Sequence, residues 1–136
     1  FAEARNLGWV APEGTSFKCF PDDPGRVRRA DTAFHRLGRL PAETARAEGH
    51  LTVVPDLVVE VVSPNDAADD VNRKRIEWLA AGAALVWVVF PLDREVHAHP
   101  AGGPVRVFGP ADYLTAEPVL PGFAVPVADL FRLPGA

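Results

Sequence analysis

The chain lacks several features that would assign it to a familiar class of protein. It has a single cysteine, Cys19, so it cannot form an internal disulfide, and the disulfide framework of a small secreted domain is excluded. Its longest apolar stretch, residues 80–90, contains Gly82 and is shorter than the roughly 20 residues that a membrane-spanning helix needs. No signal peptide is visible. These absences predict a cytoplasmic protein that has no membrane partner.

An excess of positive charge is also missing. The formal net charge is −4, which argues against a protein that is basic over its whole surface and binds nucleic acid through it. A local basic patch would still be sufficient for such binding. The chain has no glycine-rich phosphate loop, no nucleophile elbow and no CxxC motif, so three common kinds of site are absent from the sequence.

What is present suits one globular domain. The 136 residues are 48% hydrophobic and 24% charged, which allows a single core. The chain begins at Phe1, and residues 1–7 followed by Gly8 are typical of the last turns of a helix with a glycine C-cap. We therefore expect a single domain over residues 1–136, with a segment missing before it.

Hydrophobic patterns and turn residues predict a mixed sheet with helices packed on it, an α/β or α+β domain. A helix is expected over residues 67–81, after cap residues at 65–66 and before Gly82. Residues 41–50 are polar, and a short helix or a loop is expected there. Strands are expected at residues 9–10, 17–20, 28–35, 53–63 and 84–90, and a C-terminal hairpin at 95–99 and 105–108.

The strand at residues 53–63 contains an acid where apolar residues are expected. Glu60 lies in a run of valines, and a buried carboxylate is costly unless it binds a cation or accepts hydrogen bonds. Asp56 is on the same face but about 13 Å away along the strand, too far to share one ion directly. Asp31, in the preceding strand, is the natural partner. Two such carboxylates, aided by a backbone carbonyl, form an oxygen site suited to Mg²⁺. The alternative is structural, with Asp31 exposed and Glu60 paired with an arginine.

Lys74 is the candidate basic side chain for this site. Val71, Trp78 and Leu79 define the buried arc of the predicted helix, and Lys74 lies at its edge, within reach of Glu60. A lysine there could activate water or stabilise a phosphate, although a lysine that only extends into solvent has the same spacing. Arg75 falls near the middle of the arc and has no explanation from the pattern.

One possible metal motif carries less weight. His97 and His99 share a strand face with Glu95, an arrangement that could form half of a zinc site. No third cluster of ligands accompanies them, and the flanking residues indicate an exposed hairpin, so we do not expect a metal there.

Several segments together resemble the Uma2 family, also called DUF820. They are residues 28–34 (RRADTAF), 55–64 (PDLVVEVVSP), 70–82 with Lys74 and WLAAG, 85–89 (LVWVV), 119–123 (VLPGF) and 127–131 (VADLF). The resemblance implies a restriction-endonuclease-like fold with a PD-(D/E)xK-type metal site. Asp31 would be the strand acid and Glu60 the acid of the (D/E)xK element. Val62 stands where the lysine is expected, and Lys74 would supply it from the helix. The N-terminal helix and first strands of the family are mostly absent.

The resemblance and the acids together predict an endonuclease that uses Mg²⁺ or Mn²⁺ to hydrolyse DNA. Asp31 and Glu60 would bind the ion, Asp56 would assist through water, and Lys74 would orient the attacking water. Phosphates would be held by the arginines near Asp31, namely Arg28, Arg29 and Arg36. Cutting both strands requires two sites, which favours a homodimer.

Two alternatives stay open. The chain could be a nucleic-acid-binding or assembly module that keeps the nuclease fold without cleavage, as Val62 and the net charge suggest. It could also be a carboxylate-pair hydrolase acting on a substrate such as a glycan, although Lys74 then has no role.

Overall fold

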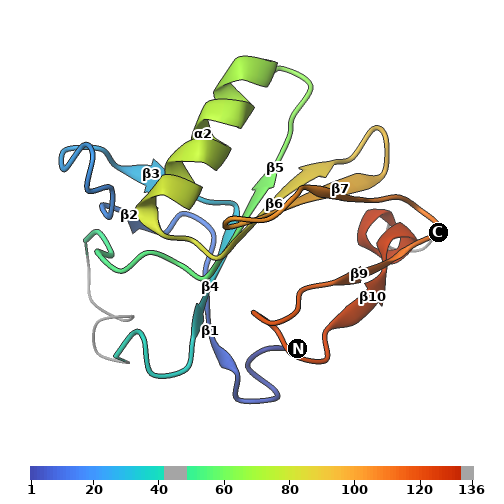
Figure 1. Ribbon diagram of the computed structural model, residues 1–136, viewed down its shortest axis with the longest axis horizontal. Coiled ribbons are helices and arrows are strands. Elements are labelled where there is room, and N and C mark those ends of the chain that lie inside the picture. The colour runs from blue at the N-terminus through green and yellow to red at the C-terminus, as the bar shows by residue number, and fades with distance from the viewer. Residues whose placement is uncertain (42–48, 133–136) are drawn as a thin grey trace.

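A six-stranded sheet forms the centre of the computed structural model, which describes residues 1–41 and 49–132 (Figure 1). The strand order is β1-β4-β5-β6-β7-β8. These strands are β1 (Gly8–Ala11), β4 (Thr32–Arg36), β5 (Leu57–Val61), β6 (Leu85–Phe90), β7 (Glu95–Pro100) and β8 (Arg106–Phe108). Two small sheets pair β2 (Ser16–Phe17) with β3 (Arg28–Arg29), and β9 (Tyr113–Thr115) with β10 (Ala124–Pro126). The described residues also contain one α-helix, α2 (Ala68–Ala81), and a 3-10 helix, η1 (Val127–Phe131).

The middle of the sheet is the parallel pair β5 and β6, and every other pairing in it is antiparallel. Helix α2 connects the two parallel strands, as such a crossover requires. Both strands are covered on two faces, which explains their nearly continuous runs of apolar residues. The expected mixed sheet in an α+β domain and the expected C-terminal hairpin are confirmed.

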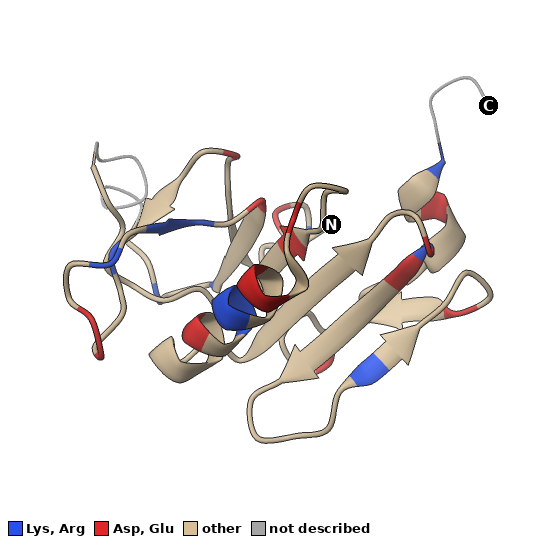
Figure 2. Cartoon of the chain, turned by 90° about the horizontal axis from the view of Figure 1, so that it is seen from above, with Lys and Arg blue, Asp and Glu red and all other residues tan. Residues whose placement is uncertain are grey.

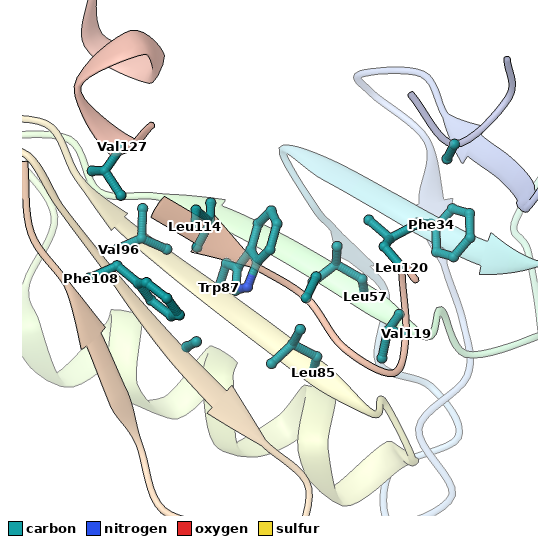
Figure 3. Close-up of a cluster of buried hydrophobic side chains, with 13 residues drawn as sticks. Phe34, Leu57, Leu85, Trp87, Val96, Phe108, Leu114, Val119, Leu120 and Val127 are labelled. Atoms are coloured by element: carbon teal, nitrogen blue, oxygen red, sulfur yellow. The ribbon is translucent and has the colours of Figure 1, made fainter. Parts of the chain in front are cut away.

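Two hydrophobic clusters lie on the two faces of the sheet. Alternate residues of β5 and β6 face α2 and pack around Trp78, which is fully buried. The residues between them, such as Leu57 and Trp87, face the segment from β9 to η1, as Figure 3 shows. One face of the sheet is therefore covered by α2 and the other by the C-terminal segment (Figure 1).

Helix α2 ends as its sequence predicts. Gly82 adopts the left-handed conformation, with φ of 111°, and the helix stops there. Its start differs from the prediction, because the cap residue is Ala67 and no side chain caps the helix. The Asp66 carboxylate instead accepts a hydrogen bond from the Ser63 N–H at 2.8 Å, which closes the turn that follows β5.

The N-terminal third departs most from the predicted elements. The strand expected at residues 28–35 is divided into β3 and β4, and the division falls at Asp31. The end of a helix expected at residues 1–7 is instead a series of hydrogen-bonded turns, and the residue there in the left-handed conformation is Asn6, with φ of 56°. Gly8 has another role, because a Cβ there would lie 2.0 Å from the His35 carbonyl oxygen. Most of the segment expected to be a helix or loop at 41–50 lies outside the described residues.

No α-helix in the described part of the chain has both the length and the apolar character needed to cross a membrane.

Candidate active site

Glu60 lies near the end of β5, beneath α2, with 9% of its surface exposed. Its Oε1 accepts a hydrogen bond from the Trp78 Nε1–H at 3.0 Å. Burial raises the pKa of the Glu60 carboxyl, while the Trp78 hydrogen bond and the positive charge of Lys74 oppose that rise. None of the ion pairs within residues 1–41 and 49–132 includes Glu60. The alternative in which an arginine neutralises Glu60 therefore has no support in this part of the structure.

Asp31 is positioned by the break between β3 and β4. Its Oδ2 accepts a hydrogen bond from the Val61 N–H at 2.6 Å, beside Glu60 in the chain. Thr32 is paired with Val59, so continuing the antiparallel register brings Asp31 opposite Glu60. The negative charge of Asp31 adds to the raised pKa of Glu60, as expected for two carboxylates that share a site. The structure thus brings together the two acids that the sequence singled out.

Two further charged residues lie near this pair. Lys74, exposed on α2, is one turn before Trp78, and its charge acts on the Glu60 carboxyl. Asp66 acts on Glu60 in the opposite sense and raises its pKa. From the sequence, Asp66 is expected only as a helix-cap residue. The sequence signal for a role near Glu60 was the position of Asp66 in the turn that follows the strand.

Asp56 is not brought into this group. It comes just before β5, at the end of the strand opposite to Glu60. Its Oδ2 accepts the Arg36 N–H at 2.7 Å, and its Oδ1 forms an ion pair with Arg39 at 2.7 Å. Both oxygens thus fix the end of β4 and the turn that follows it.

The three arginines expected to hold phosphates have different environments. Arg28 forms a bidentate ion pair with Glu77 of α2, at 2.8 and 3.1 Å, so its donors face a buried carboxylate. The side chains of Arg29 and Arg36 are exposed. Figure 2 shows β3 in blue beside α2, on which acidic and basic residues alternate. Arg36 lies at the end of β4 away from Asp31, where its N–H donates to the Asp56 carboxylate, and its side chain belongs to the other face of the sheet. Positive charge is therefore available beside Asp31 from Arg29, whereas Arg28 is occupied and Arg36 is not brought to the site.

The donor set fits a hard cation with few protein ligands. In the described residues, no group of three or more His, Cys, Asp or Glu side chains is arranged to hold a metal ion. Mg²⁺ usually keeps several waters and takes only one or two carboxylates, which Asp31 and Glu60 can supply. Both carboxylates retain an oxygen outside the hydrogen bonds to Val61 and Trp78. A cation between them would offset the repulsion that raises the Glu60 pKa.

Comparisons with known proteins identify the family and the fold of the chain. The Uma2 family model, described as "Putative restriction endonuclease", matches residues 1–128. A crystal structure from Anabaena variabilis, described as "a putative nuclease belonging to DUF820", has the same fold with a TM-score of 0.78. It is 19% identical, and the alignment covers 96% of this chain and 71% of that one. No curated protein matches the chain. The predicted resemblance to Uma2 and the predicted fold are both confirmed.

Proposed function

The chain belongs to the Uma2 family, and from this premise we propose that it is an endonuclease that uses Mg²⁺ or Mn²⁺ to hydrolyse DNA phosphodiester bonds. The observation that carries the proposal is Glu60, a buried acid with no arginine partner in the described chain, opposite Asp31 and within the field of Lys74. A buried carboxylate with a perturbed pKa in such company is typical of a functional site.

Each residue has a defined role in this proposal. Asp31 and Glu60 would hold the cation through the oxygens that Val61 and Trp78 leave available. The bound cation would polarise the phosphodiester and lower the pKa of a coordinated water. Trp78 fixes the orientation of the Glu60 carboxylate by its Nε1–H. Lys74 would orient the attacking water or stabilise the negative charge of the phosphate.

The substrate would be held by exposed positive charge. Arg29 has an exposed side chain beside Asp31 that can reach phosphates, whereas the donors of Arg28 are directed to Glu77 and Arg36 lies at the far end of β4. Asp56, held by Arg39, would contribute to the shape of the site rather than to the ion. Cleavage of both strands would require a second site, which a homodimer supplies.

One observation favours a second candidate, a nucleic-acid-binding or assembly module without cleavage. Val62 takes the position of the expected lysine, and its half-buried side chain packs on the cluster beneath α2. Catalysis then depends on Lys74, which is exposed. The module and the nuclease differ in one measurable property, because only the nuclease needs a cation bound through Glu60.

Nicking of a supercoiled plasmid by the full-length protein tests the proposal. The assay compares Mg²⁺, Mn²⁺ and EDTA, and the wild type with Glu60→Ala, Lys74→Ala and the control Glu13→Gln, which changes an exposed acid in a turn. Nicking that needs the metal and is lost in the first two variants supports the nuclease. A folded wild-type protein that neither nicks DNA nor binds Mn²⁺ by calorimetry would favour the module.

A further inference from the structure

A groove of about 320 Å³ lies between α2 and the neighbouring strands β6 and β7. Val71, Val88 and Phe90 contribute apolar walls, while Arg75, His97 and His99 contribute basic groups. The groove therefore accounts for Arg75, whose position in the apolar arc of the helix had no explanation from the sequence pattern. A half-buried cluster of three basic side chains indicates a ligand that carries negative charge.

Arg75 has a hydrogen-bond partner but no anionic one in the part of the chain that is described. Its guanidinium donates to the Asn72 Oδ1, with a distance of 3.1 Å from Nε. The ion pairs among the described residues occupy other arginines, namely Arg26, Arg28, Arg39, Arg73 and Arg132. Asn72 thus orients the guanidinium and leaves its charge to be neutralised by something else.

The two histidines add donors on the opposite wall. They are two residues apart on β7, so their rings project from the same face of the sheet towards α2. Burial lowers the pKa of His99, and the positive charges of Arg75 and His97 lower it further. Arg75 is therefore the main source of positive charge in the groove, because a charge on His99 is disfavoured and His97 has the Glu95 carboxylate 3.9 Å away. An anion bound among these groups would relieve the repulsion between them.

The sheet register relates this groove to the two acids. Glu60 is paired with Val88, and Val88 is paired with His97, so the three residues form a row across β5, β6 and β7. Two strand spacings separate Glu60 from His97, a distance of about 10 Å. A neighbouring phosphate of a strand held at Glu60 lies at a comparable distance, so the same strand can reach the groove. Asp66 lies at the end of the groove nearest Glu60 and holds the turn after β5.

We propose that Arg75, His97 and His99 form a phosphate subsite that binds the backbone of the DNA strand close to the bond to be cut. Arg75 would bind the phosphate through its guanidinium fork, and the histidine rings would donate hydrogen bonds from the other side. The inference rests on the proposed nuclease function, because it names a second place where the same strand is held.

The salt dependence of DNA binding tests this subsite directly. Binding of a fluorescent duplex is measured by anisotropy in EDTA, where no cleavage occurs, for the wild type, Arg75→Gln and His97→Gln/His99→Gln. The matched control is Arg106→Gln, an exposed arginine on the adjacent strand β8. Loss of one phosphate contact is expected to weaken binding about 5- to 10-fold and to reduce the slope of log K against log salt by about 1. The control is expected to keep the wild-type slope to within experimental error.

A titration with inorganic phosphate, followed by NMR of the histidine rings, separates this inference from the proposed function. Shifts of the His97 and His99 signals that disappear in Arg75→Gln support an anion site even if the protein does not nick DNA. Shifts without any change in the salt slope would assign the groove to a small phosphate ligand and overturn the DNA contact. A wild type that nicks DNA, with unchanged slopes in both variants and no phosphate-induced shift, overturns the subsite and leaves the nuclease standing.

Discussion

Two glutamates are buried at the packing surface between α2 and the sheet, and their environments are opposite. Glu77, on the helix, receives two hydrogen bonds from Arg28, and this arginine lowers the pKa of its carboxyl. Glu60, on β5, receives one hydrogen bond from Trp78, and burial raises the pKa of its carboxyl. Both are less than a tenth exposed, so their depth does not distinguish them.

The difference between the two acids lies in what neutralises them. Glu77 is part of an ion pair that joins α2 to β3, and its desolvation is compensated inside the protein. Glu60 faces Asp31 and Asp66, which increase the cost of ionising it, while the Trp78 hydrogen bond and the Lys74 charge act against that cost. A compensated buried acid is typical of a structural role, and an uncompensated one is typical of a site that binds a cation. The following predictions test this contrast.

The largest expected effect is on catalysis. Glu60→Gln keeps the size of the side chain and an acceptor for Trp78 but removes a ligand of the cation. We expect the nicking rate to fall by about 100- to 1000-fold, as when one electrostatic contributor to a transition state is removed. Glu77→Gln, assayed at a temperature where it is folded, should keep the wild-type rate to within a few fold. An equal loss of nicking rate in the two variants would show that the two glutamates do not differ in function.

The second largest effect is on stability, and here the substitution at Glu77 is the damaging one. Glu77→Gln leaves the partly buried Arg28 without its carboxylate, and we expect the free energy of unfolding to fall by about 2–3 kcal/mol. Urea denaturation measures the loss, with the exposed Glu13→Gln as the control. If the ion pair is responsible, Arg28→Gln combined with Glu77→Gln should cost less than the sum of the single changes.

The buried position of Glu60 was predictable from the sequence. The valine run predicted that Glu60 is a buried acid. The helical spacing of Val71, Trp78 and Leu79 predicted the helix that covers it, and the structure contains both. Local patterns carry this information because periodicity reports which face of an element is buried. They also placed Asp31 next to Glu60, because the two strands were expected to be neighbours.

The partners of the other charged residues could not be predicted. Arg28 and Glu77 are 49 residues apart, and nothing in the spacing of either indicates the other. Asp56 has the right strand face to join Glu60, but its pairing with Arg39 depends on a turn whose path is set by tertiary packing. The row from Glu60 to His97 depends on the register of three strands, which becomes visible only in the folded sheet.

The pH dependence of stability should have opposite signs for the two acids in the metal-free protein. The ordinary pKa of a glutamate is 4.5, and that of Glu77 lies below it, so its contribution is present above this pH and is lost on acidification through the lowered pKa. The pKa of Glu60 lies above 4.5, so its ionisation removes stability as the pH rises through the raised pKa. We expect Glu60→Gln to be more stable than the wild type at pH 7, by about 1 kcal/mol, and to lose that advantage near pH 4. Urea titrations from pH 3 to 8 would measure it, and an advantage that did not vary with pH would contradict the assignment.

The smallest expected effect is that of the Lys74 charge on the ionisation of Glu60. Because this side chain is exposed, Lys74→Gln should change the free energy of unfolding by less than about 0.5 kcal/mol. It should nevertheless raise the pKa of Glu60 further, because a positive charge that lowers it is removed. Titration of the Glu60 carboxyl by carbon-13 NMR measures the shift, with Lys74→Arg as the matched variant that keeps the charge. A pKa that rises in Lys74→Gln and is restored in Lys74→Arg places the lysine in the electrostatic field of the site, whereas an unchanged pKa would leave it as a solvated helix residue and favour the non-catalytic module.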